Sequence, residues 1–90
     1  MAKIVRHAHA GTLESSDAYV ELAPGSEGII ELELESPVLG QFGDAIRAAV
    51  LDTLREQEIS SAWVRVVDRG ALDCVIRARV ETAAQRAKGE

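Results

Sequence analysis

The stretch IIELELE, residues 29–35, has the clearest pattern in this 90-residue chain. Ile30, Leu32 and Leu34 alternate with glutamates at positions 31, 33 and 35. Because successive side chains of a β-strand point to opposite faces, the alternation predicts a strand with one buried and one solvated face. Burying a row of carboxylates would be very costly, so the glutamates are interpreted as a solvated face rather than a catalytic group.

The residues just before this stretch predict a second strand. Within residues 17–23, Ala18, Val20 and Leu22 share one face. The segment PGSEG, residues 24–28, separates the two strands and is typical of a turn. Because this connection is short, we expect the two strands to form an antiparallel hairpin.

A helix is predicted after residue 35. Ser36-Pro37 is a typical helix start, and the helical spacing of apolar residues continues to about residue 56 or 57. The apolar stripe consists of Phe42, Ile46, Ala49, Val50 and Leu54. Gly40 and Gly43 lie in its first half, where each costs about 1 kcal/mol relative to alanine. Their presence suggests close packing, against the hairpin or a partner subunit.

A third strand is predicted at Trp63–Asp68, with Val64 and Val66 on its inner face. Trp63 points outward on this pattern, either as a contact for a partner or as a cover for the sheet or the N-terminal segment. The last segment, from about Ala71, fits a helix best. A strand to Val80 followed by a short helix is the alternative.

These elements predict an α+β fold, a small two-layer sandwich in the order ββαβα. Its three-stranded sheet would have helices covering one face. We expect residues 1–17 to form a flexible N-terminal arm and residues 18–90 to form a single domain. His7 and His9 on the arm are interpreted as solvated imidazoles, because metal sites normally need three or four ligands.

Composition excludes several classes of protein. The formal net charge is −5 and basic residues form no patch, which argues against binding of nucleic acid. No apolar run approaches the roughly 20 residues of a membrane span, and the N-terminus has no secretory signal. Cys74 is the single cysteine, so disulfides and zinc quartets are excluded, and we expect it to be buried and inert. A soluble cytoplasmic protein is predicted.

The segment GTLESSD, residues 11–17, is the candidate functional stretch. It holds two serines between Glu14 and Asp17. A hydroxyl on such a polar segment can be reached by another enzyme. The two carboxylates are interpreted as solvating charges, with recognition by a modifying enzyme as the alternative. Taken alone, the segment is also typical of an ordinary turn.

Three blocks of sequence together resemble the citrate lyase acyl carrier protein (gamma subunit) family. They are GTLESSD at residues 11–17, QFGDAIR at 41–47 and GALDCVIRARV at 70–80. The resemblance implies that Ser15, directly after the Leu-Glu pair, is the covalent attachment point for the cofactor. Ser16 is a second hydroxyl beside it, at a position where the family pattern permits glycine.

The resemblance also implies a function. The cofactor would be 2'-(5''-phosphoribosyl)-3'-dephospho-coenzyme A, joined to Ser15 through a phosphodiester by a prosthetic-group transferase. The chain would be a non-catalytic subunit that carries acetyl and citryl as thioesters. Its partners would be an alpha subunit (acyl transferase) and a beta subunit (citryl lyase). The alternatives are an acyl carrier subunit of malonate decarboxylase and a non-carrier assembly or regulatory domain.

Overall fold

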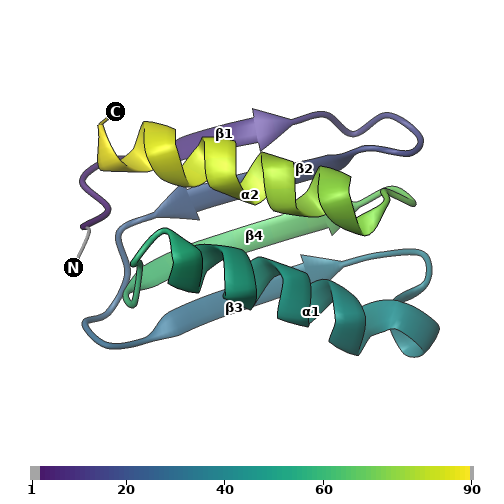
Figure 1. The fold of residues 1–90 in the computed structure, drawn as a ribbon, viewed down its shortest axis with the longest axis horizontal. Coiled ribbons are helices and arrows are strands. Elements are labelled where there is room, and N and C mark those ends of the chain that lie inside the picture. Colours follow the sequence, from purple (N-terminus) through teal and green to yellow (C-terminus); the bar gives the residue numbers. More distant parts are fainter. Residues whose placement is uncertain (1–2, 90) are drawn as a thin grey trace.

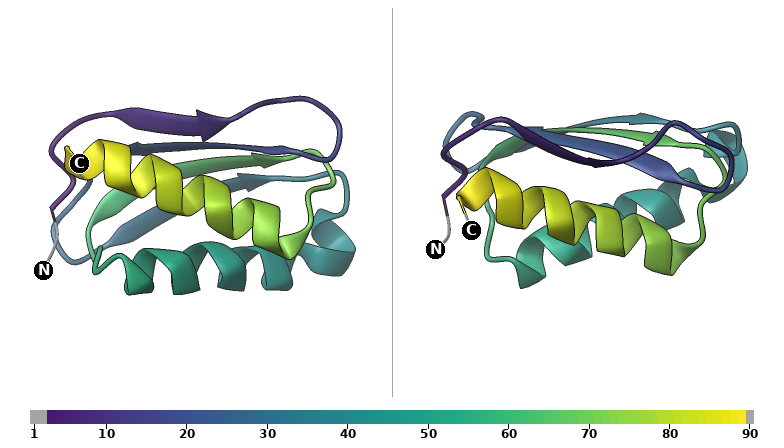
Figure 2. Two further views of the ribbon diagram at one scale, coloured as in Figure 1. Left: turned by 45° about the horizontal axis from the view of Figure 1, so that its top comes forward. Right: turned by 90° about the horizontal axis from the view of Figure 1, so that it is seen from above.

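The computed structural model describes residues 3–89, which form a four-stranded sheet and two helices (Figure 1). Their bounds are β1 Ala8–Gly11, β2 Ala18–Ala23, β3 Ile30–Glu35, α1 Leu39–Glu56, β4 Ala62–Asp68 and α2 Asp73–Lys88. Both helices lie on the same side of the sheet (Figure 2). The expected two-layer α+β sandwich with helices on one face is therefore confirmed.

The strands lie in the order β1-β2-β4-β3. β2 pairs antiparallel with β1 and β4, whereas β3 pairs with β4 in parallel. The hairpin expected between strands 18–23 and 29–35 is therefore wrong, because β4 lies between them. β4 is an inner strand of the sheet with a neighbour on each side, and its Val64, Val66 and Val67 are buried. α1 supplies the crossover that the parallel pair requires.

The expected three-stranded sheet and ββαβα order are each short by one strand. The additional strand, β1, forms within residues 1–17 and pairs with the outer edge of β2. Its inward side chains, Ala8 and Ala10, are buried, and β1 contacts α2. Two alanines give too weak an apolar alternation for the strand to be recognised from the sequence pattern.

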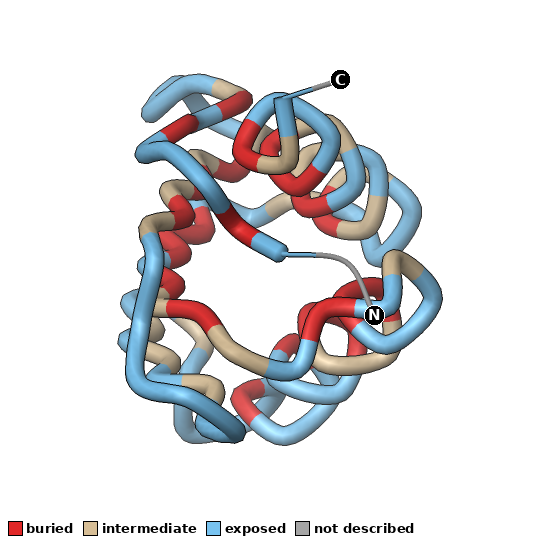
Figure 3. The backbone as a smooth tube through the Cα atoms, turned by 90° about the vertical axis from the view of Figure 1, so that its left-hand side faces the viewer, coloured by how far each residue is buried: buried red, intermediate tan, exposed pale blue. Residues whose placement is uncertain are grey.

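The core lies between the sheet and the helices, where the buried positions gather (Figure 3). Ala18, Val20 and Leu22 of β2 are fully buried, as predicted. The last segment is the helix α2, so the alternative of a strand to Val80 is wrong. The buried face of α2 consists of Ile76, Val80, Ala83, Ala84 and Ala87. None of the helices within residues 3–89 is long and apolar enough to span a membrane.

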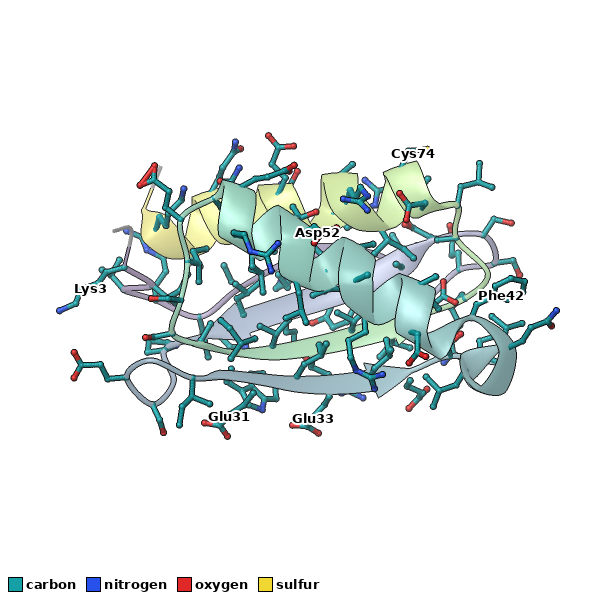
Figure 4. The ribbon with its side chains drawn as sticks, turned by 60° about the horizontal axis from the view of Figure 1, so that its bottom comes forward. Lys3, Glu31, Glu33, Phe42, Asp52 and Cys74 are labelled. Atoms are coloured by element: carbon teal, nitrogen blue, oxygen red, sulfur yellow. The ribbon has the colours of Figure 1, made fainter. Side chains whose placement is uncertain are left out.

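The start of α1 differs from the prediction. The helix begins at Leu39 rather than at Ser36-Pro37. The Ser36 hydroxyl donates to Asp68 Oδ2 at 2.7 Å, so it serves a buried carboxylate of β4 instead of capping the helix. Phe42 was predicted in the buried stripe but is 49% exposed. It lies in the first turn of α1, at one end of the molecule (Figure 4).

The two glycines of α1 do not mark a close contact with the sheet. A Cβ added at Gly43 would meet only the Leu39 side chain of the same helix, at 3.2 Å. A Cβ at Gly40 would have no neighbour within 4 Å. Close packing of the strands at residues 18–23 and 29–35 against these glycines is therefore absent among residues 3–89.

Candidate functional site

Ser15 lies on the connection between β1 and β2, which we call the serine loop (residues 11–17). The loop lies at the end of the molecule where β4 ends and α2 begins (Figure 1). Residues 12–16 are all exposed. Within residues 3–89, the Ser15 hydroxyl has no hydrogen-bond partner. It is therefore open to an incoming reagent.

Asp17 anchors the serine loop from within. Its Oδ2 accepts hydrogen bonds from the Thr12 backbone N–H at 3.1 Å and from Thr12 Oγ1 at 2.7 Å. Its Oδ1 accepts from the backbone N–H of Ala18 at 2.7 Å. Arg79 of α2 donates from Nε to the same oxygen at 2.9 Å. One carboxylate thus ties both ends of the loop to the second helix.

The charge of Asp17 is stabilised by this arrangement. The hydrogen bonds from Arg79 and then from Thr12 lower the pKa of its carboxyl from 3.8 to about 2, against an opposing effect of burial. The side chain is only 14% exposed. The interpretation of Asp17 as a solvating charge is therefore wrong, because the carboxylate holds the loop. Arg79 is far away in sequence, so the pair could not be inferred from the segment itself.

Gly11 is required where the chain leaves β1. Its φ of +88° lies in the left-handed region. A Cβ at this position would overlap the carbonyl oxygen of Ala18 on the neighbouring strand. Any other residue would have to push β1 away from β2 or change the path of the loop. The glycine of the sequence motif is thus explained by the backbone rather than by chemistry at the site.

The turn between β4 and α2 forms the second anchor. The Ser16 N–H donates to the Arg69 carbonyl at 2.8 Å, and the Arg69 N–H donates to the Asp17 carbonyl at 2.9 Å. Ser16 has a φ of 67°, which costs a non-glycine residue about 1–3 kcal/mol. Glycine adopts this conformation without strain. The backbone geometry therefore favours glycine at position 16, the residue that the resembling family permits there.

The Ser15 hydroxyl is accessible from solvent. A serine oxygen becomes a competent nucleophile only when a base removes its proton. No histidine, lysine or carboxylate within residues 3–89 makes a hydrogen bond to Ser15. Glu14 beside it is exposed, and the backbone N–H of Glu14 donates to Thr12 Oγ1 at 3.2 Å. Among residues 3–89, no hydrogen-bonded base therefore activates the Ser15 hydroxyl.

The other candidate residues lie away from Ser15. His7 Nε2 is 2.8 Å from Glu21 Oε2, and the His9 ring lies 5.7 Å from the Tyr19 ring. Both imidazoles are exposed, in agreement with their interpretation as solvated groups. Within residues 3–89, no group of three or more histidines, cysteines and carboxylates could hold a metal ion.

Cys74 is exposed rather than buried, so that expectation is wrong. It lies in the first turn of α2 (Figure 4). Its exposure leaves the thiol accessible to reagents.

The helix-free face of the sheet is acidic. Figure 4 shows Glu31 and Glu33 of β3 pointing away from the helices, as the alternation predicted. Trp63 is half-buried on this face, and its Nε1 donates to Glu33 Oε2 at 2.7 Å. The indole thus bridges β4 and β3. Its use as a contact for a partner stays a prediction.

Comparison with known families first defines a class of protein. The model of the acyl carrier protein (ACP) family described as "Malonate decarboxylase delta subunit (MdcD)" matches residues 5–87. The fold resembles one chain in the crystal structure of a Pseudomonas malonate decarboxylase hetero-tetramer in complex with malonate. The TM-score is 0.81 at 21% identity, over 96% of this chain and 88% of that one. The class is that of small α+β carrier subunits.

Curated relatives give the particular family. The citrate lyase acyl carrier protein of Vibrio cholerae (strain ATCC 39315) is 55% identical over 85 residues, which are 94% of this chain and 87% of that protein. The protein of the same name from Yersinia enterocolitica is 50% identical over 88 residues, 98% of this chain and 91% of that protein. The chain therefore belongs to the citrate lyase acyl carrier protein family.

Proposed function

We propose that this chain is the non-catalytic acyl carrier (gamma) subunit of citrate lyase, with its prosthetic group attached to Ser15. The observation that carries the proposal is the exposed Ser15 hydroxyl, which has no partner within residues 3–89, on a loop anchored at both ends. Its sequence relatives named as citrate lyase acyl carrier proteins support the choice of complex.

The residues around Ser15 fit 2'-(5''-phosphoribosyl)-3'-dephospho-coenzyme A, the group that we propose. A group of this size needs an attachment point with open space around it, and residues 12–16 are all exposed. The anchors use the backbone of Ser16 and the side chain of Asp17, so they leave the Ser15 side chain free. The sequence predicted that the whole arm, residues 1–17, is mobile. We propose mobility only for residues 13–15, which lie between the anchored residues Thr12 and Ser16.

The prosthetic group supplies the chemistry, and the chain supplies the attachment point and the folded body. When bound, the group supplies a terminal thiol that carries acetyl or citryl as a thioester. The chain supplies a rigid body and one attachment point, which raises the local concentration of the acyl group at each partner's active site. We propose three cytoplasmic partners: the alpha acyl transferase, the beta citryl lyase and the prosthetic-group transferase.

A second candidate function is the acyl carrier subunit of malonate decarboxylase. The family model carries that description, and the similar fold comes from such an enzyme. Identities of 50–55% to citrate lyase carriers, against 21% to the malonate decarboxylase chain, favour citrate lyase. A non-carrier assembly domain is the third reading.

Co-expression with the prosthetic-group transferase and cofactor-synthesis enzymes tests the proposal. We expect the intact mass to rise by one prosthetic group in the wild type and in Ser16→Ala, but not in Ser15→Ala. An unchanged wild-type mass would support the non-carrier interpretation. A Ser15→Ala variant that still gains the group would show that Ser15 is not the attachment residue. Exchange of the carried acetyl group for citrate but not for malonate, with release of acetate, would assign the acetyl-loaded chain and its partner subunits to citrate lyase rather than to malonate decarboxylase.

A further inference from the structure

An apolar cavity of about 430 Å³ lies between the first turns of α1 and α2. Its apolar lining includes Val38, Phe42, Ala45, Ile46, Leu72 and Ile76. Phe42 is 49% and Leu72 is 71% exposed, so the fold leaves about half or more of each of these large apolar side chains uncovered. The volume lies within the range of sites that bind small molecules.

The cavity is next to the serine loop. Gly70 and Ala71 line it and directly follow Arg69, whose backbone hydrogen-bonds to Ser16 and Asp17. Two Cα steps of about 3.8 Å and one hydrogen bond therefore separate Ser15 from the cavity wall at Gly70, a path of less than about 20 Å. Figure 4 shows the same end of the molecule, with Phe42 on α1 and Cys74 on α2.

The wall beside the serine loop is held in place by a buried carboxylate. Asp68 Oδ1 accepts hydrogen bonds from the backbone N–H groups of Gly70 at 3.1 Å and Ala71 at 2.8 Å. Its Oδ2 accepts from Ser36. Because one side chain joins the turn before α2 to the segment before α1, the two sides of the cavity keep their spacing.

Charge limits what can enter. Asp68 and Asp73 are the charged residues of the described lining, and both are acidic. Carboxylates repel phosphates, so an anionic nucleotide would stay outside. An uncharged, largely aliphatic chain with amide groups fits the apolar walls, and its amides can face the open mouth.

We propose that this cavity binds the uncharged pantetheine end of the group carried on Ser15, and so shelters its thiol or acetyl thioester between visits to the partner enzymes. The inference rests on the proposed attachment at Ser15. The phosphates and ribose of the group remain in solvent beside the serine loop. Leu72 and Phe42 close over the aliphatic chain, which accounts for their exposure in the chain alone.

The test compares the unloaded and loaded chain by methyl NMR, with loading verified by intact mass. We expect the methyl signals of Ile46 and Ile76 to shift on loading, together with signals from residues 12–17. Ala45→Trp fills the cavity from an exposed position of its lining and should abolish the Ile46 and Ile76 shifts. Ala48→Trp is the matched control, because Ala48 is exposed on the same helix but does not line the cavity.

Thiol accessibility gives a second readout. In a Cys74→Ser background, the carried thiol should react with a thiol reagent about tenfold more slowly than in Ala45→Trp if it occupies the cavity about 90% of the time. Ala48→Trp should match the background rate. Equal rates in all three proteins, with shifts confined to residues 12–17, would overturn the inference.

The possible failures are distinguishable. A chain that gains no mass at Ser15 refutes the proposed function and this inference together. A loaded chain whose Ile46 and Ile76 signals do not move refutes the inference alone. If those signals move only when the alpha or beta subunit is added, the cavity is a docking site for a protein, and the inference is wrong.

Discussion

The chain presents an exposed serine beside a glutamate on two connections of its sheet. Ser15 follows Glu14 on the serine loop before β2, and Ser26 precedes Glu27 on the turn after β2. The two connections lie at opposite ends of β2 (Figure 1). Exposure and local composition therefore do not distinguish the candidate site from an ordinary turn.

The difference lies in how each connection is held. The serine loop is bound through Asp17 to Arg79 of α2 and through Ser16 to Arg69. The turn at residues 24–28 is bound by the Gly28 N–H, which donates to Ser61 Oγ at 2.7 Å, and by the Ser26 carbonyl, which accepts from the Ile29 N–H at 3.2 Å. The serine loop thus fixes the approach to its serine, whereas the turn only reverses the chain. We propose that attachment at Ser15 depends on this fixed frame around its free hydroxyl.

The largest expected effect comes from moving the motif. In a Ser15→Ala variant whose residues 24–28 are replaced by the serine-loop sequence, we expect no mass gain on co-expression with the transferase, because the graft lacks Arg79 and the Arg69 carbonyl. The same graft in a chain that keeps Ser15 should gain one group, which controls for folding. Loading of the grafted serine would show that the frame is unimportant.

The next effect concerns the glycines of the two connections. Gly11 and Gly28 both have positive φ, but only a Cβ at Gly11 meets neighbouring atoms. Gly11→Ala should lower the free energy of unfolding by about 3 kcal/mol, from backbone strain plus the clash with Ala18. Gly28→Ala should cost about 1 kcal/mol, from strain alone. Urea denaturation measures both, and equal losses would contradict the tight strand exit at Gly11.

A smaller effect depends on pH. The pKa of Asp17 is lowered to about 2 in the folded chain, so its ionised form stabilises the fold by about 2 kcal/mol at neutral pH. This contribution is fully present above the unfolded pKa of 3.8 and is lost as the pH falls from about 4 toward 2. Asp17→Asn should therefore be less stable than wild type at pH 7, and the difference should shrink at pH 3.

The control for this experiment is Asp44→Asn, whose carboxyl is fully exposed on α1. It should leave the stability unchanged at both pH values. A difference between Asp17→Asn and wild type that is the same at pH 7 and pH 3 would mean that the charge of Asp17 is not what holds the loop.

The smallest effect is expected at the turn. Ser61→Ala removes the hydroxyl that accepts from Gly28 and should cost about 0.5–1 kcal/mol, because one exposed hydrogen bond is lost. It should leave loading at Ser15 unchanged in the intact-mass assay. A loss as large as that of Asp17→Asn would remove the contrast between the two connections.

Sequence patterns predicted the elements with strong alternation or helical spacing. These are β2, β3, β4 and both helices. The choice of Ser15 rests on the family resemblance and stays a prediction. The patterns missed β1, whose inward residues are two alanines, and they paired β2 with β3 because nothing local shows that β4 lies between them. The roles of Asp17 and Asp68 were also missed, since each depends on partners far away in the sequence or across the fold.

Peptide mass mapping of the chain purified with active citrate lyase from its own host tests the central claim most directly. We expect the peptide containing residues 11–17 to carry one phosphoribosyl-dephospho-coenzyme A, with fragment ions placing it on Ser15. The peptide containing Ser26 should be unmodified. An unmodified serine loop in a fully active lyase would contradict the account.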